Sequence, residues 1–183
     1  MKLGLRIAVA AGAAALAGAL LTGCASSEVS AQTPSASATN PYGGFIVDNP
    51  KDTDVVLTVT GAKSVDYTMG QLKDLADQKI SIVEPFVKKR QSFSGISLKA
   101  LLESSGIQPK DKVDTVALNE YEFADTAANL EAASAIIAVS RDNQPIPMDE
   151  GGPIRLVFDT KSKYFSNLDA WNWSLRTIKV VTK

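Results

Sequence analysis

Cysteine occurs once in the 183 residues, at position 24, and histidine does not occur. A chain with one cysteine forms no intrachain disulfide, so its fold must be held by a hydrophobic core. The same composition excludes a Ser-His-Asp triad, a Cys-His nucleophile, a His-ligated haem and a zinc site built from His and Cys. Carboxylate-only metal sites and paired-carboxylate hydrolases stay open, but no calcium-loop motif is visible. Because no motif points to either kind of site, we name no metal ligands and no catalytic residues.

The first 23 residues have the pattern of an export signal. Lys2 and Arg6 precede an apolar or small stretch at residues 7–21, which is too short to span a bilayer comfortably. The stretch ends in Leu-Thr-Gly-Cys at residues 21–24, which resembles the lipobox of bacterial lipoproteins. We expect cleavage before Cys24 and a lipid on its thiol, which would hold the exported protein at a membrane, facing the periplasm or the cell exterior. An ordinary signal peptide with a chance cysteine is the alternative.

The rest of the chain divides into a tether and one domain. Residues 24–44 are rich in Ser, Ala, Thr, Pro and Gly, a composition typical of a flexible linker. We place a single domain at residues 45–183. The formal net charge of −1 does not favour nucleic acid as a partner, and no second apolar run is long enough to span a membrane.

Short β-rich segments alternate with a few helical ones in this domain. The predicted strands lie at residues 55–60, 64–67, 79–88, 113–118, 135–139, 154–158 and 171–181. Thr68 starts a capping-box helix of two to three turns, and Ser97 is the N-cap of a second helix that ends at Gly106. The pattern predicts an α+β fold with mixed sheets or a squashed barrel and short flanking helices.

The order of several motifs resembles the oxidoreductase molybdopterin-binding domain family, which has the sulfite-oxidase fold. Residues 93–102, Phe-Ser-Gly-Ile-Ser-Leu-Lys-Ala-Leu-Leu, are similar to its F-x-G-V-x-L-x-x-L-L string. Residues 142–147 and 151–157 are similar to its D-G-x-P-L-P and G-x-P-x-R-L-V strings, and residues 171–180 resemble its terminal K-W and I-x-V. The resemblance covers residues 55–181 and implies a sulfite-oxidase-like molybdopterin-binding fold.

A narrower resemblance implies binding without redox chemistry. Residues 117–121 and 171–175 resemble the A-x-N-D-Y and W-x-W-x-L signatures of small exported members that lack molybdenum chemistry. Some of those members bind pterins and report to a membrane-bound signalling enzyme such as a cyclase or a kinase. They often carry Arg where this chain has Ala170. Catalytic members hold molybdenum through a cysteine thiolate just before the F-x-G string, and the corresponding residues 83–92 contain none.

A pterin ring needs an aromatic or guanidinium face to stack on and amide-like groups for its edge. The candidate ligand-binding residues are Trp171, Tyr121, Phe93 and Tyr164 for stacking, and Asn119, Asn172, Arg141 and Asp169 for the polar edge. Purely structural roles compete with these. Trp171 and Trp173 share one face of a predicted strand, and we expect Trp173 to be the core residue. Asn119 suits a turn, and the basic run at residues 88–90 suits a solvated face.

These observations favour an exported, lipid-anchored protein that binds a small heterocycle of the pterin or molybdopterin type and acts as a sensor for a membrane signalling partner. One alternative is a molybdopterin-dependent oxidoreductase with a non-standard metal site. Another is a protein-interaction lipoprotein that uses the fold as a scaffold. The acid pairs Asp149 with Glu150, and Glu122 with Asp125, show no spacing that demonstrates a glycosidase.

Overall fold

The computed structural model describes residues 48–181. The predicted signal peptide, Cys24, the tether and the predicted first residues of the domain lie outside this range. In the described range, no helix combines the length and the apolar composition that crossing a membrane requires.

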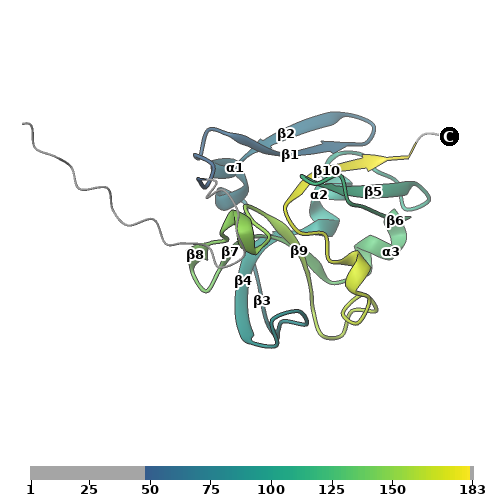
Figure 1. The fold of residues 1–183 in the computed structure, drawn as a ribbon. Coiled ribbons are helices and arrows are strands. Elements are labelled where there is room, and N and C mark those ends of the chain that lie inside the picture. The colour runs from purple at the N-terminus through teal and green to yellow at the C-terminus, as the bar shows by residue number, and fades with distance from the viewer. Residues whose placement is uncertain (1–47, 182–183) are drawn as a thin grey trace, which may run out of the picture. The chain divides into compact units, whose positions relative to one another are not determined.

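The first sheet is mixed, with strand order β2-β1-β10-β5-β6. Its strands are β1 (Val55–Thr60), β2 (Ser64–Thr68), β5 (Lys112–Ala117), β6 (Glu122–Thr126) and β10 (Leu175–Val180). Three neighbouring pairs are antiparallel, whereas β1 and β10 run parallel with Val59 opposite Ile178. The parallel pair joins the two ends of the domain, so the C-terminal strand closes the sheet at its centre (Figure 1).

The second sheet is antiparallel, with order β3-β4-β7-β8, and β9 pairs with β7 as well. Its strands are β3 (Gln78–Val83), β4 (Arg90–Ser97), β7 (Ala135–Arg141), β8 (Gln144–Pro145) and β9 (Arg155–Phe158). The register of β4 on β7 shifts between Ser94 and Gly95. A Cβ at Gly95 would lie 2.1 Å from the Ile137 carbonyl oxygen, so glycine is required for this close approach.

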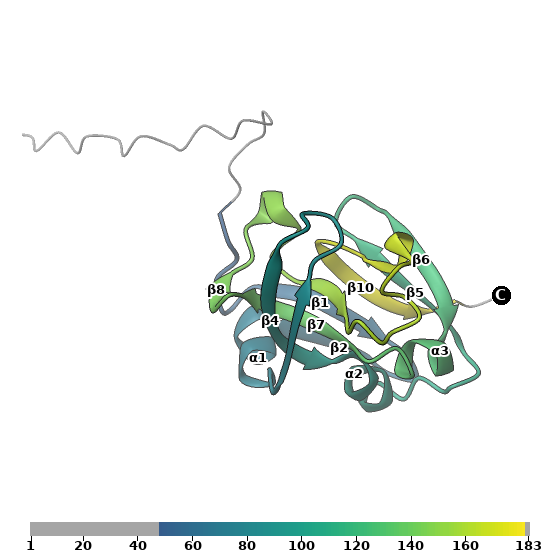
Figure 2. The same ribbon diagram turned by 90° about the horizontal axis from the view of Figure 1, so that it is seen from below.

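Within residues 48–181, three short α-helices pack beside the sheets, and Figure 2 shows α1 and α2 along one side of the domain. They are α1 (Met69–Asp74), α2 (Leu98–Ser104) and α3 (Ala127–Glu131), and two 3-10 helices are η1 (Met148–Glu150) and η2 (Leu168–Ala170). Helix α1 contacts β2, β4 and β7, so it touches both sheets, while α2 packs on β4, β7 and α3. Thr68 and Gln71 form the predicted capping box, and Ser97 caps α2 through the Ala100 N–H.

One continuous core cluster unites the two sheets. It includes Leu57 and Ile178 from the first sheet and Phe93, Ile137 and Leu156 from the second, all fully buried. Burial of this kind, at about 25 cal/mol per Å² of apolar surface, is what stabilises a domain without disulfides. The α+β fold with mixed sheets and short flanking helices is therefore confirmed.

Four details of the predicted elements are wrong. The strand predicted at residues 79–88 ends at Val83, because Glu84 accepts from the N–H groups of Phe86 and Val87 and turns the chain. Strands β4 and β6 were not predicted, because β4 is rich in Ser and Gln and owes its conformation to pairing with β3 and β7. Helix α1 has only six residues. Residues 171–174 are not a strand, because Trp171 is the C-cap of η2 and Ser174 has a φ of 50°.

Candidate ligand-binding pocket

Three connections between elements meet at a pocket of about 330 Å³. The β3–β4 connection contributes Phe86, the β5–β6 connection contributes Asn119 and Tyr121, and the chain from η2 to β10 contributes most of the rest. The lining residues are Phe86, Ala117, Asn119, Tyr121, Leu168, Asp169, Trp171, Asn172 and Trp173. We call this the aromatic pocket. Its walls come largely from loops that the two sheets hold in place, which is typical of binding sites.

The β5–β6 turn is fixed by its own hydrogen bonds. The Asn119 side-chain oxygen accepts from the Tyr121 N–H at 3.2 Å, which is the turn-forming role considered for this residue. Glu120 between them has a φ of 65°. The Tyr121 hydroxyl donates to the Asp169 carbonyl oxygen at 2.9 Å and so ties the turn to η2. Burial, and then the charge of Asp169, raise the pKa of Tyr121, so it stays a neutral phenol at physiological pH.

Asn172 anchors the pocket to the first sheet. Its side-chain amide donates to the Thr115 carbonyl oxygen at 2.8 Å and to the Thr115 hydroxyl at 3.3 Å. These bonds set the orientation of the amide, because the Thr115 carbonyl can only accept. Asn172 is fully buried, and its Oδ1 has no hydrogen-bond partner among the described residues. A buried acceptor without a partner is costly, so it is a group that a ligand could satisfy.

The two tryptophans exchange the roles that the sequence suggested. Trp171 is 3% exposed and belongs to the core, where it packs on Phe158 and Phe165 and donates through Nε1 to the Tyr164 carbonyl oxygen. Trp173 is only partly buried. The expectation that Trp173 is the core residue is therefore wrong, because the two residues do not lie on a strand. Phe86 meets both indoles edge-on, with centroid distances of 6.1 Å to Trp171 and 4.8 Å to Trp173.

A buried ion pair that the sequence motifs did not predict lies behind these aromatic rings. Arg155 donates to Glu84 at 2.9 Å, and both side chains are at most 2% exposed. The other Glu84 oxygen accepts from the N–H groups of Phe86 and Val87 at 2.8 Å each. The Arg155 guanidinium lies 4.0 Å from the centroid of the Trp173 ring. Glu84 and Arg155 thus hold the loop that carries Phe86 and support Trp173 from behind.

Burial lowers the pKa of Arg155 to about 10, an effect that the neighbouring Glu84 opposes. Arg155 is therefore still charged near neutral pH. One signal in the sequence pointed to this pair. Arginine inside the otherwise apolar segment Ile154–Phe158 needs an acidic partner if the strand is buried.

The structure brings together five of the eight candidate ligand-binding residues, namely Trp171, Asn119, Tyr121, Asn172 and Asp169. It places the other three elsewhere. Phe93 is fully buried because it points inward from β4, and Arg141 forms an ion pair with Glu150. Tyr164 is 3% exposed, and its hydroxyl donates to Asp125. These three therefore line no wall of the aromatic pocket.

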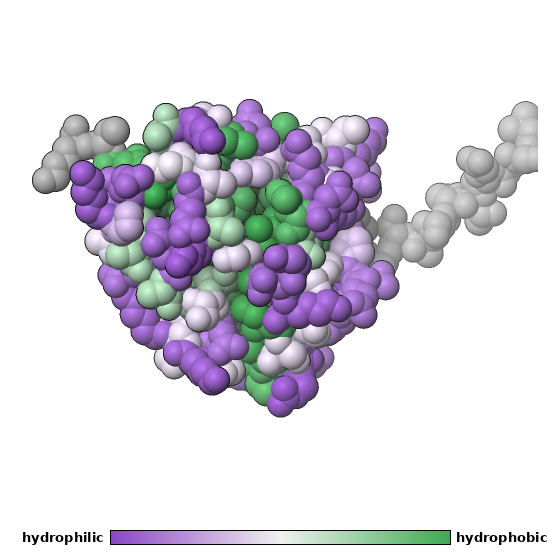
Figure 3. Space-filling model, turned by 180° about the vertical axis from the view of Figure 1, so that it is seen from behind, coloured by the Kyte–Doolittle hydropathy of each residue, from purple (hydrophilic) through white to green (hydrophobic). Residues whose placement is uncertain are grey.

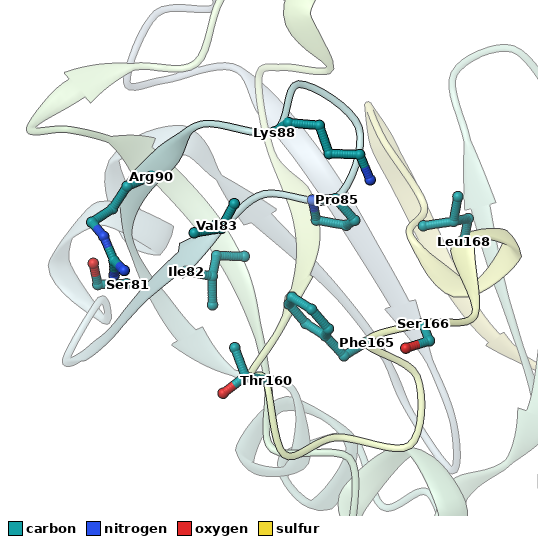
Figure 4. A pocket seen from close by; sticks show the side chains of 10 residues that line it. All are labelled: Ser81, Ile82, Val83, Pro85, Lys88, Arg90, Thr160, Phe165, Ser166 and Leu168. Atoms are coloured by element: carbon teal, nitrogen blue, oxygen red, sulfur yellow. The ribbon is translucent and has the colours of Figure 1, made fainter.

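The same β3–β4 connection, through Pro85 and Lys88, also lines a larger pocket of about 680 Å³. We call it the basic pocket, because Lys88 and Arg90 line it and no acidic residue of the described range does. Figure 4 shows the apolar side chains of Ile82 and Phe165 near each other, with Arg90 beside Ser81 and Lys88 on the β3–β4 connection. Leu168 lines both pockets. The basic run that suggested a solvated face therefore borders a cavity with two of its three residues.

One protein-family model matches the part of the chain that contains the β3–β4 connection. The model of the oxidoreductase molybdopterin binding domain matches residues 83–166. Residues 83–166 are therefore similar to the oxidoreductase molybdopterin-binding domain family. The match includes the β3–β4 connection and Arg155, but Leu168–Trp173 of the aromatic pocket lie beyond it. No curated protein matches the sequence.

A solved structure shows the same fold for this molybdopterin-binding domain. It is the sulfane dehydrogenase SoxCD from Paracoccus pantotrophus, with a TM-score of 0.57 and 12% sequence identity. The similarity covers 75% of this chain and 40% of the SoxCD chain. The chain thus spans about two fifths of that relative's length, and at this identity the similarity establishes the fold alone.

The side chains of the matched region do not fit a molybdenum centre of the kind that a thiolate holds. Residues 83–92 carry no cysteine or histidine. Within residues 48–181, no cluster of three or more His, Cys, Asp or Glu side chains is placed to hold a metal ion. Molybdenum in this fold needs a soft thiolate ligand, and these residues offer none. The aromatic pocket offers ring faces and amide groups instead, which fit an organic heterocycle.

Proposed function

We propose that this protein is an exported, lipid-anchored binding protein for a pterin-type heterocycle and that it carries out no molybdenum redox chemistry. The observation that carries the proposal is the aromatic pocket. It combines the exposed ring of Phe86 and the indole of Trp173 with the amides of Asn119 and Asn172. Flat heterocycles bind between ring faces and are oriented by a few fixed polar groups. The family supports a pterin, because molybdopterin is built on one.

Direct binding tests the proposal. Both tryptophans of the chain line the aromatic pocket, so a bound pterin should quench the intrinsic fluorescence. The purified full chain would be denatured to look for the fluorescence of a released pterin, and it would be titrated with pterin by calorimetry. We expect saturable binding with one site. If no pterin is released and none binds, the proposal fails.

Phe86 and Val87 provide a matched pair of variants. They are neighbours in one loop and are 41% and 48% exposed, but only Phe86 lines the aromatic pocket. Loss of one stacking ring costs about 1–3 kcal/mol, so Phe86→Leu should weaken pterin binding about tenfold. Val87→Ala should leave the affinity unchanged. Equal effects of both variants would mean that the loop, rather than the ring, determines binding.

The membrane partner is part of the same proposal. A lipid on Cys24 would keep the domain at a membrane, where a signalling enzyme such as a cyclase or a kinase would respond to the bound state. Cys24→Ser should move the protein from the membrane fraction to the supernatant without changing the pterin affinity. Retention of this variant in the membrane fraction would contradict lipid anchoring.

The two alternatives predict other results. An oxidoreductase with a non-standard metal site would carry molybdenum after expression in a host that makes the cofactor, and elemental analysis measures this. A protein-interaction scaffold favours a broad exposed apolar patch. On the face shown in Figure 3, hydrophobic side chains form a band between hydrophilic ones. This band is a feature of the kind that the scaffold alternative favours, whereas the aromatic pocket gives ligand binding a defined set of contacts.

A further inference from the structure

The charge of the aromatic pocket indicates which heterocycle it accepts. Within residues 48–181, Asp169 is its one charged lining residue, and the carboxylate of Asp169 has no ion-pair partner there. The raised pKa of Tyr121, which burial and then Asp169 cause, is consistent with this negative charge. Neither Lys nor Arg of the described range lines the pocket. A ligand here therefore meets negative charge.

The nearby buried cation does not compensate for Asp169. Arg155 lies behind Trp173, but its charge is paired with Glu84 at 2.9 Å in a buried contact. The Oδ1 of Asn172, which has no partner in the described part of the chain, adds a second acceptor among the lining residues. Lys88 and Arg90 line the basic pocket instead. The arrangement separates acceptors in one pocket from cations in the other.

On the basis of the proposed function, we propose that the aromatic pocket selects a phosphate-free ring that presents adjacent N–H donors to Asp169. The 2-amino group and N3–H of a pterin form such an edge, and a carboxylate accepts both bonds at once. A phosphate monoester carries a charge of about −1.5 to −2 at pH 7, and Asp169 repels it. Molybdopterin carries a phosphate, so the pocket disfavours it relative to a free pterin.

Three probes and two variants test this selectivity by calorimetry on the full chain. The probes are 6-hydroxymethylpterin, its phosphate monoester, and lumazine, in which a carbonyl replaces the 2-amino group. We expect the ester and lumazine to bind at least about tenfold more weakly than 6-hydroxymethylpterin. Asp169→Asn should weaken the binding of 6-hydroxymethylpterin, because the variant removes the charge and one acceptor. For the same reason it should reduce the differences in affinity between 6-hydroxymethylpterin and the other two probes.

Glu120→Gln is the matched control, because Glu120 is an exposed acid in the β5–β6 turn that pairs with Arg176 and does not line the pocket. This variant should leave the order of the three binding affinities unchanged. If all three probes bind equally, or if Glu120→Gln reduces the differences as much as Asp169→Asn, the selectivity is overturned and pterin binding stands. If none of the probes binds, the proposed function itself fails.

Discussion

The aromatic pocket and the basic pocket share Leu168 and are both lined by the β3–β4 connection, yet their linings differ in charge and their volumes differ in size. The first has ring faces, amides and one carboxylate. The second is lined by two cations together with apolar and hydroxyl side chains, and it is about twice as large, at 680 Å³ against 330 Å³. A single loop, held by Glu84, therefore lines two pockets of different charge. Substitutions in the loop, in either pocket or next to a pocket test whether the two pockets act independently.

The largest effect should come from the ion pair that holds the loop. Glu84→Gln leaves the buried charge of Arg155 unpaired and weakens the bonds to Phe86 and Val87. We expect a loss of about 3–5 kcal/mol in the free energy of unfolding, measured by urea denaturation. The double variant Glu84→Leu with Arg155→Met should recover part of this loss. A single variant as stable as the parent would show that the pair does not hold the loop.

Gly151→Ala should disturb the aromatic pocket and leave the lining of the basic pocket unchanged. Gly151 has a φ of +88°, and a Cβ there would lie 2.8 Å from the Trp173 ring. Backbone strain and the contact together should cost about 1–3 kcal/mol in unfolding free energy, and the displaced indole should weaken pterin binding. Fluorescence quenching measures the second effect. Gly106→Ala, also at positive φ but beside Ala62, is the control that should lose stability without losing affinity.

Neutralising the basic pocket should leave the aromatic pocket nearly unaffected. Lys88→Gln with Arg90→Gln removes both cations, and neither side chain lines the aromatic pocket. The affinity for a neutral pterin should change by less than about twofold, because exposed charges are screened within about 10 Å at 0.1 M salt. A large loss of pterin affinity in calorimetry would mean that one ligand spans both pockets.

The smallest expected effect is a change in the pKa of Tyr121. The charge of Asp169 contributes, after burial, to the raised pKa of Tyr121. Asp169→Asn should therefore lower this pKa toward its ordinary value, while burial keeps it above that value. Absorbance titration at high pH, with Tyr121→Phe to assign the signal, measures the shift. An unchanged titration would place the carboxylate too far away to act on a ligand beside Tyr121.

The sequence predicted well those features that depend on neighbouring residues. The strand at 55–60, the caps at Thr68 and Ser97, and the turn at Asn119 follow from local hydrogen bonds and side-chain shape. It failed where pairing with distant strands decides the conformation, as in β4, and where the end of η2 redirects Trp171 and Trp173. The candidate site was predicted in part, because Asn119, Tyr121, Asp169, Trp171 and Asn172 fall within two short segments.

The excluded kinds of site and the resemblance to the family could be derived from the sequence without coordinates. One cysteine at position 24 and no histidine leave no thiolate in residues 83–92, whatever the fold does. Which side chains meet could be learned only from the folded domain. Glu84 and Arg155 are 71 residues apart and pair although β4 and β7 lie between β3 and β9 in the strand order. Phe86, in the connection after β3, meets tryptophans that precede β10 of the other sheet. The composition limits which kinds of site the side chains can form. Long-range pairing of strands and packing of the connections between them decide which of these side chains meet.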